Sequence, residues 1–341
     1  MKPLTVLVCF ALLAVLLLVW SYILRLVWTK PSRFRSLLVR SSLSIAVTAC
    51  IFFALELIFY SSFAVSDNFG FTLAGQRWAE KYWHPINSFG YRDVEHGPAE
   101  FHNKEVLFVV GDSFVAGAGI PRIENRFSNI LQTNLGEQYV VVNIAKSGWD
   151  TSDEYQAILA YPHKPKKIIL SYFINDIKGA ATRLGYRDPV RVEPPANRIV
   201  RYSINSSYSL NFAYWRLYRF YNKALGETYW DYLEKSYSHQ DIWKAHEAEL
   251  FKIVTYAQEH DIGLIVVVFP NLFRVKGSAA MTSKVAEFLR EHCVPVLNLE
   301  PLLEGRDPKS LVVNSLDAHP SESLNAEVGE LLTKAVQADS R

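Results

Sequence analysis

An uncharged run from Leu4 to Leu24, LTVLVCFALLAVLLLVWSYIL, constrains this chain more than any other feature. A helix needs about 20 apolar residues to cross the ~30 Å hydrocarbon core of a bilayer, and this run is long enough. The alternative is a cleavable signal peptide, which has a shorter apolar region followed by small residues. Here the bulky residues Tyr22, Ile23 and Leu24 end the run. The run therefore predicts a membrane span that is retained.

A second apolar run, Leu43–Val65, predicts a second membrane span. Its length and its position favour a span over the core helix of a soluble protein. The run contains one charged residue, Glu56. An ionisable group at membrane depth is costly, so it usually faces protein or water and often has a role. Alternatively, Glu56 lies near the interface and reaches headgroup water, and the sequence leaves both alternatives open.

The segment between the two runs is basic, which predicts an orientation. It contains Lys30, Arg33, Arg35 and Arg40, whereas Lys2 alone precedes the first run and Asp67 follows the second. The positive-inside rule places such a segment in the cytoplasm. Residues 1–66 are then a transmembrane hairpin with both ends outside the cytoplasm. In a bacterium, this orientation places residues 67–341 in the periplasm, held at the inner membrane by two spans.

Charge and cysteine content exclude some classes of function. The chain has 341 residues and a net charge of +2, but its first 66 residues are strongly basic, so the remainder is slightly acidic. A nucleic-acid-binding protein normally presents a basic face, so nucleic acid is not expected as a partner. The chain has three cysteines, no CxxC and no histidine pair at metal-ligand spacing. We therefore expect neither a metal site nor a cofactor.

Strand and helix patterns alternate after a connector at 67–103. Continuous apolar runs predict buried strands, and apolar residues at helical spacing predict the helices between them. The strands are expected at 104–110, 139–144, 166–173, 262–269 and 294–297, and the helices at 127–135, 151–159, 242–260 and 278–292. Such alternation is typical of an α/β fold with a flavodoxin-like, doubly wound parallel sheet. The predicted domain covers residues 104–341, with an irregular insertion at 180–240 that is either a lid or a partner surface.

Polar residues follow the predicted strands, where parallel sheets bind ligands. Ser113 follows the first strand, Gly148 the second and Asn175 the third, while Asp317 and His319 lie in a loop after the last strand. Serine is a weak nucleophile that needs a base, and the base needs a partner to hold its tautomer. An oxyanion needs hydrogen-bond donors such as backbone amides and an asparagine side chain. These residues could together perform acyl transfer chemistry.

Other motifs for this region fit less well. The GxSxG elbow of α/β-hydrolases requires glycine at position 115, which is Val115. The glycines of GDSFVAGAG are not followed by Gly-Lys-Ser/Thr, and GxGxxG is absent. A nucleotide site is therefore a weak interpretation.

The combination of four short blocks resembles the SGNH/GDSL hydrolase family. The blocks are GDSFVAG at 111–117, SGWDT at 147–151, FIND at 173–176 and DAHPS at 317–321, in the family's order. The NSFGYRD stretch in the connector looks like the lead-in of membrane-tethered members. The resemblance spans about residues 104–335 and implies a three-layer α/β/α fold in a membrane-anchored member.

The resemblance also implies a role for each residue. Ser113 would be the nucleophile, His319 the general base and then acid, and Asp317 the residue that orients His319. The amides of Ser113 and Gly148 and the side chain of Asn175 would form the oxyanion hole.

Three positions depart from the family pattern. Phe173 stands where the third block has glycine, and Phe114 replaces the leucine of GDSL. The last block is often Asp-x-x-His, whereas Asp317 precedes His319 by two positions.

Three functions remain open from the sequence. The first is a membrane-anchored serine esterase that hydrolyses acyl esters, chiefly O-acetyl esters, of an extracytoplasmic glycan or lipid. The second is an O-acyltransferase with the same residues, in which a sugar hydroxyl replaces water and a multi-span membrane partner delivers the acyl group. The third is a non-catalytic glycan-binding module, against which the intact Ser, Asn, Asp and His weigh.

Overall fold

The computed structural model describes residues 3–27, 32–67, 70, 72–222 and 224–338. These residues form two compact units. The helical unit contains the described residues of 1–65, 69–78 and 192–223. The α/β unit contains those of 66–68, 79–191 and 224–341. Lys2 and Lys30, which contributed to the predicted orientation, lie outside the described residues.

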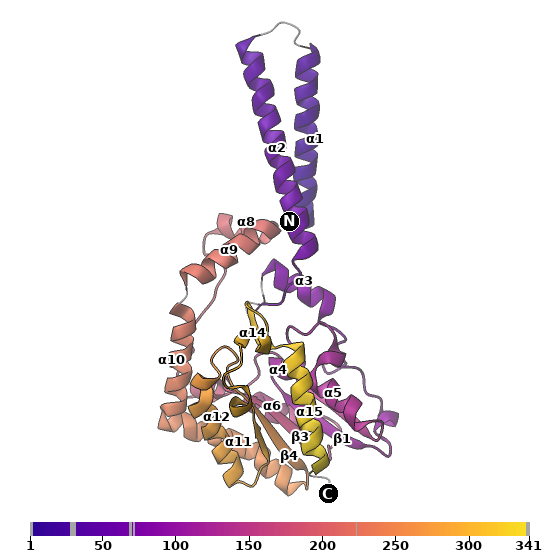
Figure 1. Ribbon diagram of the computed structural model, residues 1–341, viewed down its shortest axis with the longest axis vertical. Coiled ribbons are helices and arrows are strands. Elements are labelled where there is room, and N and C mark those ends of the chain that lie inside the picture. Colours follow the sequence, from indigo (N-terminus) through magenta and orange to yellow (C-terminus); the bar gives the residue numbers. More distant parts are fainter. Residues whose placement is uncertain (1–2, 28–31, 68–69, 71, 223, 339–341) are drawn as a thin grey trace. The chain divides into compact units, whose positions relative to one another are not determined.

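A five-stranded parallel sheet organises the α/β unit (Figure 1). Its strands are β1 (Glu105–Gly111), β2 (Tyr139–Ala145), β3 (Lys167–Phe173), β4 (Gly263–Phe269) and β5 (Val296–Asn298). They pair in the order β2-β1-β3-β4-β5. This is the flavodoxin-like order of a doubly wound sheet, which confirms the predicted fold class. The order places β1 between β2 and β3, so the loops that follow these three strands lie at one edge.

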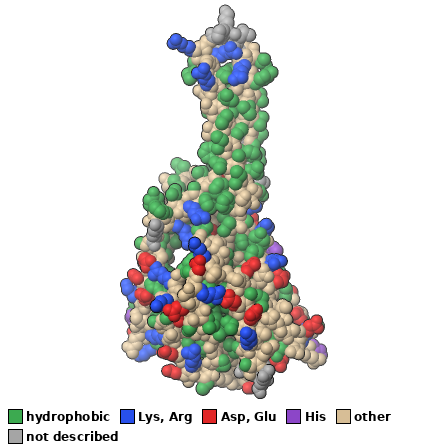
Figure 2. All heavy atoms as spheres, viewed as in Figure 1, with side chains coloured by type: hydrophobic (Ala, Val, Ile, Leu, Met, Phe, Trp, Pro, Cys, Tyr) green, Lys and Arg blue, Asp and Glu red, His purple; other side chains and the backbone are tan. Residues whose placement is uncertain are grey.

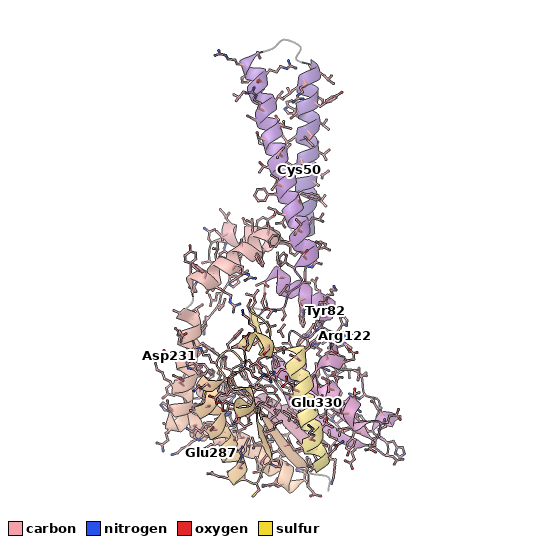
Figure 3. All side chains as sticks on the ribbon, in the orientation of Figure 1. Cys50, Tyr82, Arg122, Asp231, Glu287 and Glu330 are labelled. Atoms are coloured by element: carbon pink, nitrogen blue, oxygen red, sulfur yellow. The ribbon has the colours of Figure 1, made fainter. Side chains whose placement is uncertain are left out.

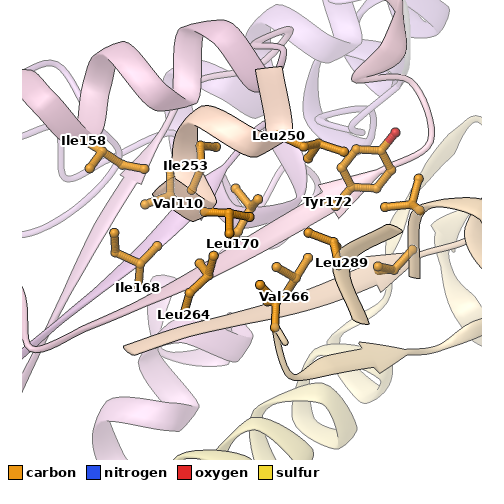
Figure 4. Packing of buried hydrophobic residues seen from close by; sticks show 14 of the residues in the cluster. Val110, Ile158, Ile168, Leu170, Tyr172, Leu250, Ile253, Leu264, Val266 and Leu289 are labelled. Carbon is orange, nitrogen blue, oxygen red and sulfur yellow. The ribbon is translucent and has the colours of Figure 1, made fainter. Parts of the chain in front are cut away.

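Helices cover both faces of the sheet, because successive strand residues point to opposite sides. Along β1, Val106, Phe108 and Val110 join one apolar cluster, while Leu107 and Val109 join the other. Figure 4 shows the packing of the first cluster. Its helices are α6 (Thr151–Ala160), α7 (Ile177–Arg183), α10 (Ala224–Ser238), α11 (Gln240–Glu259) and α12 (Ala279–Glu291). The second cluster includes α4 (Ser113–Ala116), α5 (Phe127–Leu135), α13 (Glu300–Leu303), α14 (Pro308–Leu311) and α15 (Glu322–Ala338).

Charged side chains line the outer sides of these helices. Asp231 on α10, Glu287 on α12 and Glu330 on α15 are all exposed (Figure 3). The remaining short elements are η1 (Pro98–Phe101), η2 (Ile123–Asn125), η3 (Lys276–Ser278) and an antiparallel pair, β6 (Val312–Asn314) with β7 (Asp317–Pro320). The helix α3 (Leu73–Tyr82) runs from the helical unit into the α/β unit.

Three local predictions differ from the structure. The segment 180–240 is largely helical rather than irregular, and its last helix, α10, contributes Trp230 and Leu233 to the core of the α/β unit. The sequence TSDE at 151–154 predicts a capping box, whereas the box of α6 begins at Asp150 with Asp153 as its partner. Asp317 and His319 lie on the strand β7 rather than in a loop.

Two long helices, α1 (Pro3–Val27) and α2 (Arg33–Ser62), lie side by side in the helical unit (Figure 1). Small residues, among them Ala14, Ala46 and Ala49, are buried, while many large apolar side chains are exposed. Figure 2 shows hydrophobic side chains covering both helices on the visible face. By length and composition, Arg33–Ser62 is long and apolar enough to cross a membrane, and Ala11–Val27 is a shorter apolar stretch. The two helices are compatible with the predicted hairpin.

Glu56 of α2 is buried, with 1% of its surface exposed, and it faces protein. Its carboxylate accepts hydrogen bonds from the backbone N–H groups of Tyr208 at 2.7 Å and Ser209 at 3.0 Å. The hydroxyl groups of Ser207 and Ser209 donate to it as well. These donors begin the helix α9 (Tyr208–Tyr221), which follows α8 (Arg198–Ser206). A carboxylate at a helix N-terminus is stabilised by the unpaired N–H groups and the helix dipole. Of the two alternatives for Glu56, the structure therefore supports contact with protein.

Candidate active site

The turn after β1 presents Ser113 at the edge of the sheet. Asp112 caps this turn, because its carboxylate accepts the N–H of Phe114 at 2.8 Å. Ser113 opens the short helix α4, and Gly117 ends it with a left-handed backbone at φ 71°. The Ser113 side chain is half-buried, so its hydroxyl is partly accessible at the start of α4.

His319 and Asp317 complete a hydrogen-bonded chain with Ser113. The distance between His319 Nε2 and Ser113 Oγ is 2.8 Å. The other ring nitrogen, Nδ1, is hydrogen-bonded to Asp317 Oδ1, and the His319 backbone N–H also donates to that oxygen at 3.1 Å. Residues two apart on a strand point to the same side, so the strand β7 makes the short Asp-x-His spacing workable. The structure thus brings the three predicted residues together.

Asp317 is fully buried, and its second carboxylate oxygen, Oδ2, accepts the hydroxyl of Ser66. Burial would raise the pKa of Asp317. The hydrogen bond and charge of His319, together with the Ser66 hydroxyl, outweigh burial and lower the pKa below its usual value. Asp317 is therefore held as a carboxylate beside His319. Sequence reasoning missed Ser66, since nothing in a serine after an apolar run points to a site 251 residues away.

The predicted oxyanion donors come from the loops after β2 and β3. Gly148 lies in the exposed loop between β2 and α6, with φ 84°. Asn175 follows β3 and is half-buried, and its Oδ1 has no hydrogen-bond partner among the described residues. Because β2 and β3 both pair with β1 in parallel, these loops flank the Ser113 turn.

The two phenylalanines that depart from the family pattern pack against each other beside the histidine. The rings of Phe114 and Phe173 are stacked with centroids 4.3 Å apart. Phe114 also meets the His319 ring edge-to-face at 5.5 Å and the Phe269 ring at 5.2 Å. The larger side chain at 173 thus fills space next to Phe114. An edge-to-face aromatic contact of this kind is a favourable geometry for two rings.

Three buried carboxyl groups lie behind the Ser113 turn. Asp112, Glu154 and Asp176 are each 1% exposed or less. Burial, opposed by hydrogen bonds such as that from Phe114 N–H, raises the pKa of Asp112. Burial and the neighbouring carboxylates raise the pKa values of Glu154 and Asp176 well above their usual range. Neither oxygen of Glu154 has a hydrogen-bond partner among the described residues. The protonated form of Glu154 is therefore strongly favoured.

The connector forms hydrogen bonds with the segment that follows Ser113. Arg92 donates to the carbonyl oxygens of Gly117 at 2.6 Å and Ile120 at 2.7 Å. Burial and the nearby Arg126 guanidinium lower the pKa of Arg92 to about 9, so Arg92 stays charged at neutral pH. Next to it, Asp93 accepts the backbone N–H of Asn143 on β2 at 2.9 Å. Arg92 thus holds the end of the Ser113 turn, and Asp93 ties the connector to β2.

The described residues contain no group of three or more His, Cys, Asp or Glu side chains arranged to hold a metal ion.

No family model matches the chain, and no curated protein matches it. Several solved structures are similar. One, from Desulfitobacterium hafniense DCB-2, is described as a lipolytic protein of the G-D-S-L family. It is 17% identical to this chain, and the alignment covers 68% of this chain and 99% of that protein, with a TM-score of 0.40. A carbohydrate acetylesterase from Sinorhizobium meliloti has 13% identity, 69% and 99% coverage and a TM-score of 0.40. An aryl esterase of M. smegmatis has 14% identity, the same coverage and a TM-score of 0.40. At these identities and TM-scores the likeness does not transfer an activity, so the function must follow from the site itself.

Proposed function

We propose that this chain is a membrane-anchored serine ester hydrolase of SGNH type. The observation that carries the proposal is the hydrogen-bonded chain from Ser113 Oγ through the His319 ring to the buried Asp317 carboxylate. A serine next to a histidine is common on protein surfaces. A histidine whose second nitrogen is held by a buried carboxylate is the arrangement that activates a serine hydroxyl.

In the first half of the reaction, Ser113 Oγ attacks the carbonyl carbon of the ester while His319 Nε2 takes the hydroxyl proton. The carbonyl oxygen becomes an oxyanion, and we assign its stabilisation to the amides of Ser113 and Gly148 and to Asn175. His319 then returns the proton to the departing alcohol oxygen. The carbon–oxygen bond to the alcohol breaks, which leaves the acyl group on Ser113.

In the second half, water replaces the alcohol. His319 takes a proton from water as its oxygen attacks the acyl carbon, and then protonates Ser113 Oγ as that bond breaks. Asp317 holds the imidazole in one tautomer and stabilises the imidazolium that forms in each half. The products are the free acid and the regenerated serine, so no cofactor is needed.

We assign the substrate to acyl esters, chiefly O-acetyl esters, of a glycan or lipid outside the cytoplasm. This assignment depends on membrane anchoring by α1 and α2, which the exposed apolar side chains of both helices support. The helices α8 and α9 add exposed apolar residues, such as Ile199 and Phe220, next to exposed Arg198, Arg201 and Arg216. Apolar and basic faces on one helix pair are typical of helices at a membrane interface.

The activity can be tested on the full chain purified in detergent, with p-nitrophenyl acetate as substrate. We expect turnover by the wild type and loss of turnover by at least about 10³-fold in Ser113→Ala, because the nucleophile is removed. Equal rates for the two proteins would reject the esterase proposal. Faster ester consumption on adding a glycan, with acylated glycan as product, would instead identify an acyltransferase.

The orientation can be tested with Cys293, an exposed cysteine of the α/β unit. In intact bacterial spheroplasts, a maleimide that cannot cross membranes should label Cys293 without lysis, and Cys293→Ser should abolish that labelling. Cys50 on α2 is also exposed on the protein surface (Figure 3), but inside a bilayer it should resist the reagent. Labelling of Cys293 only after lysis would place the α/β unit in the cytoplasm.

A further inference from the structure

Ser66 contacts the site although it lies 251 positions before Asp317 in the sequence. It follows Ser62, the last residue of α2, by four positions, and it belongs to the α/β unit. Its hydroxyl donates to Asp317 Oδ2. Its backbone carbonyl oxygen accepts Asn314 Nδ2 at 3.1 Å, which ties the same residue to the neighbouring strand β6. Two hydrogen bonds therefore place Ser66 against the β6–β7 pair.

With Ser66 in place, both oxygens of the Asp317 carboxylate are occupied. His319 bonds Oδ1 from one side, and Ser66 bonds Oδ2 from the other. Ser66 is 8% exposed and Asp317 is 0% exposed, so water cannot readily replace the serine hydroxyl. Gly119 lies close to the same oxygen, because a Cβ added to it would be 2.9 Å from Oδ2. A buried carboxylate with one oxygen unpaired would be costly and could rotate away from the histidine.

We propose that Ser66 is a positioning residue for the reaction, supplied by the segment that follows α2. By fixing the plane of the Asp317 carboxylate, it keeps the His319 Nδ1 proton pointed at Oδ1 and leaves Nε2 free to take the Ser113 proton. This inference rests on the roles proposed above for Asp317 and His319. A chain that begins at residue 67 would lack this hydroxyl.

The test compares Ser66→Ala with Ser66→Thr, which retains the hydroxyl, in the full chain in detergent. Ser61→Ala is the matched control, because the Ser61 hydroxyl bonds within α2, to Ile58 O at 3.1 Å. We expect Ser66→Ala to lower kcat about ten- to a hundredfold, the range for one hydrogen bond to a charged group, with little change in KM. Ser66→Thr should recover most of kcat, and Ser61→Ala should match the wild type.

A double mutant separates positioning from a general effect on folding. If Ser66 acts through Asp317, Ser66→Ala should lower kcat very little in an Asp317→Asn background, because the carboxylate it holds is already lost. The unfolding midpoint of each variant shows whether it is folded. A loss of kcat of equal size in both backgrounds, or a wild-type kcat in folded Ser66→Ala, would overturn the inference.

A third readout does not depend on turnover. The His319 Nδ1 proton should give a low-field proton NMR signal that shifts or broadens in Ser66→Ala and stays in place in Ser61→Ala. If the wild type proves inactive on every ester, the proposed function fails, yet this signal still tests the contact. A signal that is unchanged in Ser66→Ala would refute the positioning role.

Discussion

Replacing Glu154 with glutamine should make the α/β unit more stable at neutral and higher pH. Glu154 is 0% exposed, and neither of its oxygens has a hydrogen-bond partner among the described residues. Burial first, and then the charges of Asp112, Asp150 and Asp153, raise its pKa well above the usual range. Its ionised form is therefore disfavoured in the folded protein, whereas the unfolded chain ionises it freely.

The direction of this pH effect on stability depends on how many protons the folded and unfolded states bind. Between the pKa of the unfolded chain, about 4.3, and the raised pKa of the folded protein, the native state binds more protons than the unfolded state. The stability from this group is fully present below the unfolded pKa and is lost as pH rises towards the folded pKa. The free energy of unfolding falls by at most about 1.4 kcal/mol per pH unit. For a domain of this size, this lowers the unfolding midpoint by about 3–6 °C per pH unit. Glutamine cannot ionise, so this pH-dependent decrease in stability should disappear.

The assay is the thermal unfolding midpoint, followed by tryptophan fluorescence between about pH 5 and pH 8, where glutamate ionises in an unfolded chain. The control is Glu330→Gln, since Glu330 is exposed on α15 (Figure 3). We expect a shallower pH dependence for Glu154→Gln alone, with the gain over the wild type growing as pH rises. A pH dependence identical to that of the wild type would refute the argument that Glu154 is buried as the acid.

Substitutions at three further positions have defined outcomes. Gly119→Ala should lower both the unfolding midpoint and kcat, because φ is 81° and the new Cβ would lie 2.4 Å from Val313 Cγ2. An unfolding midpoint and a kcat equal to those of the wild type would contradict the geometry of that turn. In chemical unfolding, Phe114→Ala should lower the stability of the α/β unit by about 3–5 kcal/mol, and Phe114→Leu by less than about 1.5 kcal/mol. Losses of similar size in the two variants would argue against the ring stacking. Glu56→Ala removes all the hydrogen bonds that Glu56 accepts at the start of α9. Limited proteolysis should therefore cut residues 207–209 faster than in the wild type. Unchanged cleavage would show that this cap is dispensable.

Much of the α/β unit could be predicted because its signals are local. A strand buried on both faces is a continuous apolar run, so β1, β3 and β4 were found to within one residue of their ends. The helix α5 was predicted at 127–135 from its apolar spacing, and in the structure Gly136 caps its end. The site residues Ser113 and His319 were found through their motifs, and the parallel sheet explains why residues far apart in the sequence meet at one edge.

Two kinds of feature were missed: helices whose local signal is weak, and contacts between residues far apart in the sequence. The helices α8 and α9 begin with Asn197 and Ser207 as caps, but the prolines before them and the dense aromatic residues hid the apolar periodicity. The contact of Ser66 with Asp317 joins residues 251 positions apart, and no spacing rule describes it. Glu56 could be recognised as unusual from its place in an apolar run, but its partners became visible only in the folded chain.

The central claim is that His319 activates Ser113 as a nucleophile. The most direct measurement is covalent labelling of the full chain by a fluorophosphonate, with the modified residue located by peptide mass spectrometry. We expect one adduct, on Ser113, and a labelling rate that falls at least about a hundredfold in His319→Ala, since the general base is lost. Labelling at another residue, or an equal rate in the wild type and His319→Ala, would contradict the account.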